Sequence, residues 1–302
     1  MRRGGTRRHR PTGRTVPTEP TLDADSPATG RIAPAIAGGT HVGVVRRVNQ
    51  DAFGLFEDAK REETLLVVAD GLGGHRGGEV ASRLAVDLLG RNFSLGDGDP
   101  PTRLVQAIES ANADILRHAN RERTLRGMGT TVVCLLLGPN GRAHVAHVGD
   151  SRLYRLRDGS IEPITEDHSL VATLVRQGVI SSEEARTDPR RNQILRALGV
   201  RNDVEVDVAP LEPRPGDTYL LCSDGLHGLV DDDAIHALVH SANDLDAAVA
   251  DLIDAAKRAG GTDNVTCVLA RLPGSARPPA GHPDASAGAG AVRGLLDRPE
   301  SE

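Results

Sequence analysis

Five aspartates stand where an apolar segment of the sequence begins or ends, and most have glycine or another small residue beside them. Asp70, Asp150 and Asp224 close the segments "LLVVAD", "AHVGD" and "YLLCSD", whereas Asp51 and Asp263 stand just before "AFGLF" and "NVTCVL". Aspartate and glycine are good turn formers, so a turn explains any one of these positions. Five carboxylates that converged at one end of a sheet would repel one another unless a cation neutralised them.

The atoms available beside these aspartates predict which cation that would be. Carboxylate and backbone oxygens select hard ions such as Mg²⁺ or Mn²⁺ over zinc. Five glycines lie in the eight positions after Asp70. A backbone without side chains can approach an ion closely, and its carbonyl oxygen can itself be a ligand. The pattern therefore predicts a divalent metal site, although spacing alone does not show that the five aspartates meet.

Cysteine and histidine offer no convincing zinc site. Cys134, Cys222 and Cys267 each lie in an apolar run, and no CxxC spacing occurs. We expect buried free thiols in a reducing compartment. His144 and His147 stand three apart on a predicted strand and therefore point to opposite faces, which disfavours a shared metal.

The elements that must position these residues are strands in groups, with helices in pairs between them. This grouping predicts an α+β fold with largely antiparallel sheets and disfavours a doubly wound parallel sheet. Strands are predicted at 41–45, 52–56, 65–69, 130–137, 143–149, 152–157, 204–208, 217–222 and 264–271. Helices are predicted at 78–92, 101–120, 231–241 and 244–259, and short helices within 165–199, where Ser181 and Glu184 form a capping box.

The two ends of the chain differ in composition from the middle. Residues 1–37 are rich in Arg, Thr and Pro, and residues 273–302 are rich in Pro, Ala and Gly. We predict a disordered basic tail and a second disordered tail around a domain at 38–272. No apolar h-region follows the basic start and no run approaches the ~18 apolar residues of a membrane span, so we expect neither a secretory signal nor a transmembrane segment. The arginine-rich start could be a transit peptide, or it could contact an acidic partner or anionic lipid.

Composition argues against nucleic acid as a partner. Aromatic residues make up 2% of the chain, tryptophan is absent and the formal net charge is −6. A surface for stacking bases and a basic patch for phosphates are therefore both poorly supplied.

Six motifs, in order, resemble those of the metal-dependent protein phosphatases, the PP2C-like serine/threonine phosphatases, and are most similar to the bacterial type. They are "VRRVNQD", "VADGLGGHRGGE", "GMGTT", "HVGDSRLYRL", "CSDGL" and "GGTDNVT". The segment from "ITEDHSL" to "ILRALG" also resembles the flap of that type. The resemblance covers residues 39–271. It implies a sandwich of two antiparallel sheets flanked by pairs of helices.

The resemblance also implies a centre of two Mn²⁺ or Mg²⁺ ions. By motif position, Asp70 bridges both ions, and Asp224 and Asp263 complete the site of one. The carbonyl of Gly71 binds the other, which Asp51 reaches directly or through water. In this family, water shared by the two ions attacks phosphorus directly, without a phosphoenzyme.

A third ion is a further possibility that the resemblance raises. Asp150 together with Asp224 matches the third-metal site of bacterial relatives, and Asn192 is a candidate ligand from the flap. Two departures bear on the ions. Gly228 stands where some relatives carry an acid, and Gln50 replaces a common glutamate.

Two further residues are implied in catalysis. Arg46 matches the arginine that clamps the substrate phosphate, with its neighbour Arg47 as the rival, because a guanidinium offers the bidentate geometry that phosphate prefers. His75 resembles the proposed general acid, and the alternative is a loop histidine held among glycines. His227, beside the Asp224 turn, is predicted to face solvent.

The function so implied is hydrolysis of phosphoserine and phosphothreonine by a cytoplasmic, monomeric enzyme. Its partners would be phosphoproteins, namely serine/threonine kinases and their substrates. Two alternatives stay open: a catalytically weak pseudophosphatase that binds phosphoproteins or a kinase, and a phosphatase of small phosphorylated metabolites.

Overall fold

The computed structural model describes residues 34–73 and 76–274. His75 lies outside these ranges, as do nearly all residues of the two predicted tails. The first described strand begins at Ala35, inside the segment 1–37 predicted as a tail.

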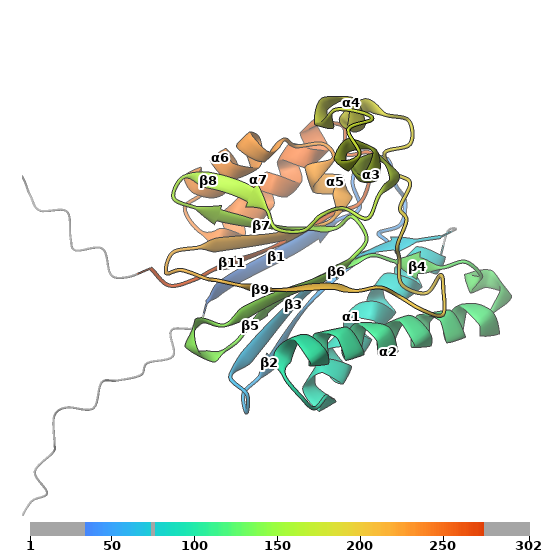
Figure 1. Ribbon diagram of the computed structural model, residues 1–302. Helices are drawn as coiled ribbons and strands as arrows, with labels where there is room; N and C mark the ends of the chain where they lie inside the picture. The colour runs from blue at the N-terminus through green and yellow to red at the C-terminus, as the bar shows by residue number, and fades with distance from the viewer. Residues whose placement is uncertain (1–33, 74–75, 275–302) are drawn as a thin grey trace, which may run out of the picture. The chain divides into compact units, whose positions relative to one another are not determined.

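Two antiparallel sheets form the centre of the described fold (Figure 1). Every pairing between neighbouring strands is antiparallel. The first sheet has the order β1 (Ala35–His41), β11 (Val265–Arg271), β10 (Thr218–Cys222), β7 (Arg152–Arg157) and β8 (Ser160–Pro163). The second has the order β2 (Asp51–Asp58), β3 (Glu63–Leu72), β5 (Val132–Leu137), β6 (Ala143–Val148) and β9 (Asp207–Leu211), with the short β4 (Gly129–Thr130) paired to β3.

Helices cover the outer face of each sheet, so the predicted sandwich with flanking helix pairs is confirmed. The pair α1 (Gly77–Leu95) and α2 (Pro100–Arg121) packs on the second sheet, and the pair α6 (Asp232–Ser241) and α7 (Leu245–Arg258) packs on the first. Three short helices, α3 (Leu170–Arg176), α4 (Ser182–Thr187) and α5 (Asp224–His227), lie together at one end (Figure 1). In the part of the chain that the structure describes, no helix combines the length and apolarity needed to cross a membrane.

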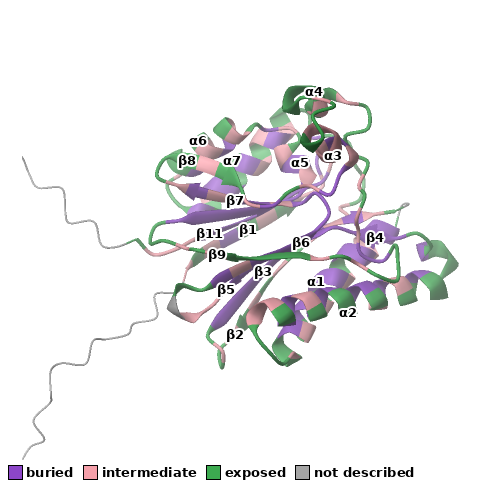
Figure 2. Ribbon diagram, in the orientation of Figure 1, coloured by how far each residue is buried: buried purple, intermediate pink, exposed green. Residues whose placement is uncertain are grey.

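Alternating residues of the strands build separate apolar layers. On β3, Leu66 and Val68 pack between the two sheets, whereas Leu65 and Val67 pack against α1 and α2. This alternation follows from the two-residue period of a strand. Because both faces of β3 are covered, all four side chains are buried, and Figure 2 shows the central strands buried and the outer helix faces exposed.

The segment between β8 and β9 is the predicted flap, which we define as residues 165–199. It contains α3 and α4. The predicted capping box is confirmed at the start of α4: the Glu184 N–H donates to Ser181 Oγ at 3.2 Å, and the Ser181 N–H donates to Glu184 Oε2 at 2.7 Å. These two bonds satisfy donors that the helix start leaves free.

Two predicted strands differ from the structure. The prediction at 41–45 is wrong, because β1 ends at His41 and a loop follows in which Val44 and Val45 are exposed. The true strand, "AIAGGTH", has paired glycines that hide its apolar pattern. At Gly39, a Cβ would lie only 2.7 Å from an α7 side chain, so close packing requires glycine there. β9 begins at Asp207, within the strand predicted at 204–208.

We expect Leu135→Ala to lower the free energy of unfolding by about 2–5 kcal/mol, because it opens a cavity in the layer between the sheets. Leu135 is fully buried there. Leu95→Ala is the matched control, because Leu95 is 75% exposed at the end of α1, and its effect should stay within about 0.5 kcal/mol. Urea unfolding followed by circular dichroism measures both. Equal effects would contradict the assignment of this layer as core.

Candidate metal centre and active site

Strand ends from both sheets bring the five predicted aspartates to one end of the sandwich. Asp51 on β2 and Asp70 on β3 are direct partners in the antiparallel register. Asp150 follows β6, Asp224 begins α5 directly after β10, and Asp263 precedes β11. The negative charges of the other four aspartates all act on Asp70, so all four lie within electrostatic reach of it.

Burial and mutual repulsion make these carboxyls hard to ionise without a cation. Burial, followed by repulsion from Asp51, raises the pKa of Asp70 well above its usual range. Burial raises the pKa of Asp51 to about 7, although a hydrogen bond from Ser223 opposes the rise. Burial and then Asp263 raise the pKa of Asp224 to about 6. A bound cation would remove this cost by favouring the charged forms.

Three of the aspartates present a buried oxygen without a partner. Oδ1 of Asp51, Oδ1 of Asp150 and Oδ1 of Asp224 have no hydrogen-bond partner among the described residues. Leaving a buried acceptor unsatisfied costs about 1–3 kcal/mol, and more for a charged group. Anionic oxygens gathered in this way are ligands that Mg²⁺ and Mn²⁺ prefer. The side chains present therefore fit a divalent metal centre.

Gly71 is glycine because the backbone around it leaves no room for a side chain. A Cβ at this position would lie 2.1 Å from the carbonyl oxygen of Gly78 and 2.6 Å from that of Gln50. The Gly71 N–H donates to the Gln50 carbonyl at 3.0 Å, which ties β3 to the loop before β2. The glycines that follow Asp70 thus let the start of α1 approach the aspartates closely.

Hydroxyl groups hold the two paired aspartates in place. The Thr131 Oγ1 accepts from the Asp70 N–H at 3.0 Å, and the Thr130 Oγ1 donates to the Asp70 carbonyl at 2.8 Å. The Ser223 Oγ donates to Asp51 Oδ2 at 2.7 Å, so only Oδ1 of that carboxylate is left without a partner. None of these hydroxyls was predicted, although all three stand inside or beside the quoted motifs.

Asn264 is another site residue that sequence reasoning missed. Its Nδ2 donates to the carbonyls of Val42 and Val48, at 2.9 and 3.0 Å, and its Oδ1 accepts from the Gln50 N–H at 2.8 Å. These three bonds fix the loop between β1 and β2. Its position after Asp263 in "TDNVT" is the only sequence signal for it.

The same loop directs Arg46 toward the aspartates. Its Nη2 donates to Asp263 Oδ2 at 2.7 Å, and the side chain is 50% exposed. The hydrogen bond and charge of Asp263, with further attraction from Asp224 and Asp70, raise the pKa of Arg46. Arg47 makes no such side-chain bond within the described residues.

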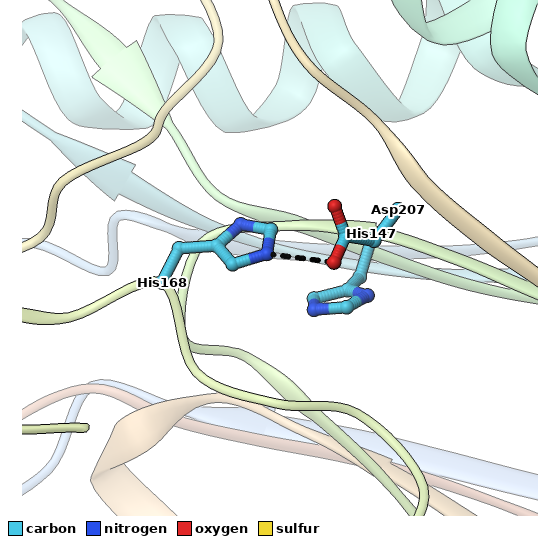
Figure 3. A group of neighbouring side chains, drawn as sticks. All are labelled: His147, His168 and Asp207. Carbon is cyan, nitrogen blue, oxygen red and sulfur yellow. Dashed lines mark ion pairs between the residues drawn. The ribbon is translucent and has the colours of Figure 1, made fainter. Parts of the chain in front are cut away.

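A different group of side chains is the tightest cluster of possible ligands. Within residues 34–73 and 76–274, only His147, His168 and Asp207 place three ligand atoms within 4.8 Å of one another (Figure 3). The aspartates are spread more widely than this. Sequence reasoning considered His147 only with His144 and missed its proximity to His168.

Most of the possible ligand atoms in the histidine cluster already have a hydrogen-bond or ion-pair partner. The His168 Nδ1 accepts from the Gly149 N–H at 3.1 Å, so its proton is on Nε2, which faces Asp207 Oδ2 at 3.3 Å. Arg196 donates to Asp207 Oδ1 at 2.8 Å. The rings of His147 and His168 stack with centroids 4.6 Å apart, and His147 Nε2 donates to the Glu166 carbonyl at 2.9 Å. The cluster instead fastens the base of the flap to the turn that carries Asp150.

The prediction that His227 faces solvent is wrong. The first turn after β10 folds back over Asp150, and His227 Nε2 donates to the Asp150 carbonyl at 3.0 Å. Burial lowers the pKa of His227 to about 3, so the ring is neutral at physiological pH. His227 therefore supports the backbone of one of the predicted ligands.

A cavity of about 520 Å³ adjoins the aspartates beneath the flap. Asn192, the candidate ligand from the flap, lines the same cavity as Asp150 and Asp224. The volume lies within the ~300–1,000 Å³ of typical ligand sites.

The amino-acid sequence is similar over most of its length to those of protein phosphatases. Residues 39–269 match the sequence profile of the protein phosphatase 2C family. The serine/threonine phosphatase stp of Listeria monocytogenes is 40% identical over 235 residues, which are 76% of this chain and 92% of that protein. The serine/threonine protein phosphatase PstP of Mycobacterium tuberculosis is 42% identical over 229 residues, which are 76% of this chain and 43% of that protein.

Solved structures of serine/threonine phosphatases are similar to this structure as well. The crystal structure of the Mycobacterium tuberculosis phosphatase PstP/Ppp has a TM-score of 0.73 and 39% identity, covering 80% of this chain and 100% of that one. The catalytic domain of PstP in complex with two manganese ions has a TM-score of 0.71 and 38% identity, covering 80% of this chain and 99% of that one.

We expect MnCl₂ to raise the melting temperature of the EDTA-treated protein by about 5–10 °C when free metal exceeds its dissociation constant about 100-fold. The cation would relieve the repulsion among the buried aspartates. Asp51→Asn removes one ligand and should reduce the shift, whereas Asp251→Asn, on the exposed face of α7, should not. Differential scanning calorimetry gives the values. If manganese does not change the melting temperature, the metal centre is ruled out.

Proposed function

The chain belongs to the protein phosphatase 2C family, and we propose that its five aspartates form the centre at which it hydrolyses phosphoserine and phosphothreonine. It is a metal-dependent serine/threonine protein phosphatase of the bacterial type, and its substrates are phosphoproteins. The observation that carries the site assignment is the set of three buried carboxylate oxygens without partners at the meeting point of both sheets.

We assign the two ions by motif position and by these contacts. Asp70, Asp224 and Asp263 would hold one ion, and Asp70, the Gly71 carbonyl and Asp51 would hold the other. Two bound Mn²⁺ or Mg²⁺ ions supply Lewis acidity, which makes water a better nucleophile and neutralises charge on the phosphoryl group.

The chain's own residues keep the ligands ready for those ions. Ser223 occupies Oδ2 of Asp51 and leaves Oδ1 available, so the carboxylate is oriented before a cation arrives. Thr130 and Thr131 hold the Asp70 backbone on both its N–H and its carbonyl. Such preorganisation lowers the cost of assembling a charged centre.

Arg46 is the residue that would orient the phosphoryl group. One of its nitrogens binds Asp263, and the half-exposed guanidinium has further N–H groups that can donate to phosphate. The hydrogen bond to Asp263 thereby fixes the orientation of the Arg46 guanidinium. We keep His75 as the general acid that protonates the leaving oxygen, a role that rests on its motif position alone.

We propose that a third ion binds weakly between Asp150 and Asp224. Oδ1 of Asp150 is buried without a partner, which favours a cation there. Gly228, four residues after Asp224, offers no side chain to complete the site. Asn192 lines the same cavity and is the candidate for the missing ligand.

We further propose that the enzyme is a cytoplasmic monomer that acts on serine/threonine kinases and their substrates. Cys134, Cys222 and Cys267 are free and buried, which fits a reducing compartment. Cys222 and Cys267 are even direct partners in the register of β10 and β11 and are not bonded to each other. The pseudophosphatase alternative is disfavoured because every metal position of the motifs carries its aspartate.

The protein should hydrolyse p-nitrophenyl phosphate and phosphothreonine peptides in the presence of Mn²⁺, and excess EDTA should abolish both activities. Asp224→Asn should lower kcat at least ~100-fold because it removes a charged ligand, with Asp251→Asn as the control that keeps the activity. Phosphate release measures the rates, and circular dichroism checks the fold. Robust turnover in EDTA, or in the Asp224 variant, would overturn the assignment.

Arg46→Ala should reduce kcat/KM for a phosphothreonine peptide about 10–100-fold, the range expected for losing hydrogen bonds to a charged group. Arg47→Ala, the neighbour without a side-chain bond to the aspartates, should change it less than about threefold. Steady-state kinetics at saturating Mn²⁺ compare the two variants. If Arg47→Ala causes the larger loss, the phosphate clamp is Arg47.

A further inference from the structure

Side chains of both charges line the cavity beneath the flap. Asp150, Asp224 and Asp263 line it, and so do Arg186 and Arg191 of the flap. On the basis of the proposed function, we propose that Arg186 and Arg191 bind an anionic side chain that neighbours the phosphorylated residue in the substrate.

Most charges around the cavity are already matched. Arg152 binds both oxygens of Asp167, at 2.7 and 2.8 Å, and Arg176 forms an ion pair with Glu166. Asp232 accepts a hydrogen bond from a tyrosine hydroxyl at 3.1 Å and lies in the first turn of α6, where the helix dipole favours a negative charge.

Among the arginines that line the cavity, Arg186 and Arg191 are the exceptions. Neither side chain has an ion-pair or hydrogen-bond partner within the described part of the chain, and both are exposed. Both line the same cavity as Asp150 and Asp224. Once cations neutralise Asp150, Asp224 and Asp263, these two arginines leave the cavity with unmatched positive charge, which attracts anions.

The neighbouring residue Arg190 shows the contrast. Its guanidinium binds both oxygens of Asp188, at 2.9 and 2.8 Å, and it does not line the cavity. The charge of Arg190 is therefore neutralised within the flap, whereas the adjacent Arg191 lines the cavity without an ion-pair partner.

The flap is fastened so that it presents these arginines in a defined position. The capping box at Ser181 fixes the start of α4, which carries Arg186 near its end. The segments of the chain that enter and leave the flap are joined by two backbone hydrogen bonds. The Leu170 N–H donates to the Gln193 carbonyl at 2.9 Å, and the Leu195 N–H donates to the His168 carbonyl at 2.7 Å. Arg191 stands two residues before this junction.

The chemistry of the ligand follows from the guanidinium fork, which suits carboxylate and phosphate alike. The phosphate that is hydrolysed belongs at the aspartates and Arg46, so we assign the second anion to another residue of the same substrate. It is a glutamate, an aspartate or a second phosphorylated residue.

The test uses phosphothreonine peptides in which each neighbouring position carries Gln, Glu, Lys or a non-hydrolysable phosphonate residue in turn. For at least one position, the wild-type protein should show about fivefold higher kcat/KM with Glu than with Gln. The double variant R186A/R191A should lose this preference, R190A should keep it, and R186E/R191E should prefer Lys. Rates are divided by the same variant's rate with p-nitrophenyl phosphate, which corrects for damage to the centre or the fold.

The outcomes separate cleanly. Equal wild-type rates for Gln, Glu and phosphonate at every position overturn the inference, and so does a preference that survives in R186A/R191A or is lost equally in R190A. A preference for Glu identifies carboxylate as the ligand, and a preference for phosphonate alone identifies a second phosphate. Failure of the proposed function is different, because the wild-type protein would then hydrolyse none of the peptides.

Discussion

Repulsion among carboxylates in a region shielded from water is the constraint around which this end of the molecule is arranged. Asp51 and Asp70 are held side by side by the register of β2 and β3, and Asp224 is brought to them from the other sheet. Their raised pKa values express the cost of that proximity. Because the aspartates come from both sheets, the apolar layer between the sheets is what keeps the like charges together.

The aspartates and the helix pairs were predictable because they leave local signals. A carboxylate that closes an apolar run, such as Asp70, is visible in a few residues, and so is the capping box at Ser181. Contacts between distant residues leave none: Arg46 and Asp263 are 217 positions apart, and only the fold brings them together. The apolar Val44 misled the strand prediction because it is exposed in the loop that carries Arg46.

The side chains that hold the aspartates and the neighbouring loop in place were the ones missed. Ser223, Thr131 and Asn264 are small polar residues whose types suit many turns and strands, so their hydrogen bonds become evident only with coordinates. His227 was misjudged for a related reason, because a turn of α5 carries it back over Asp150. Position within the motifs led to the proposed ligands by resemblance but gave no reason to expect these supporting hydrogen bonds.

The place of β11 has a consequence for how the enzyme is made. Among residues 34–274, apart from the undescribed 74–75, β11 is the last strand, yet it lies between β1 and β10, and β1 joins its sheet only by pairing with it. A nascent chain still on the ribosome therefore has an incomplete sheet until residue 271 has emerged, and Asp263 cannot reach its neighbours earlier. The five aspartates would therefore come together only at a late step of synthesis.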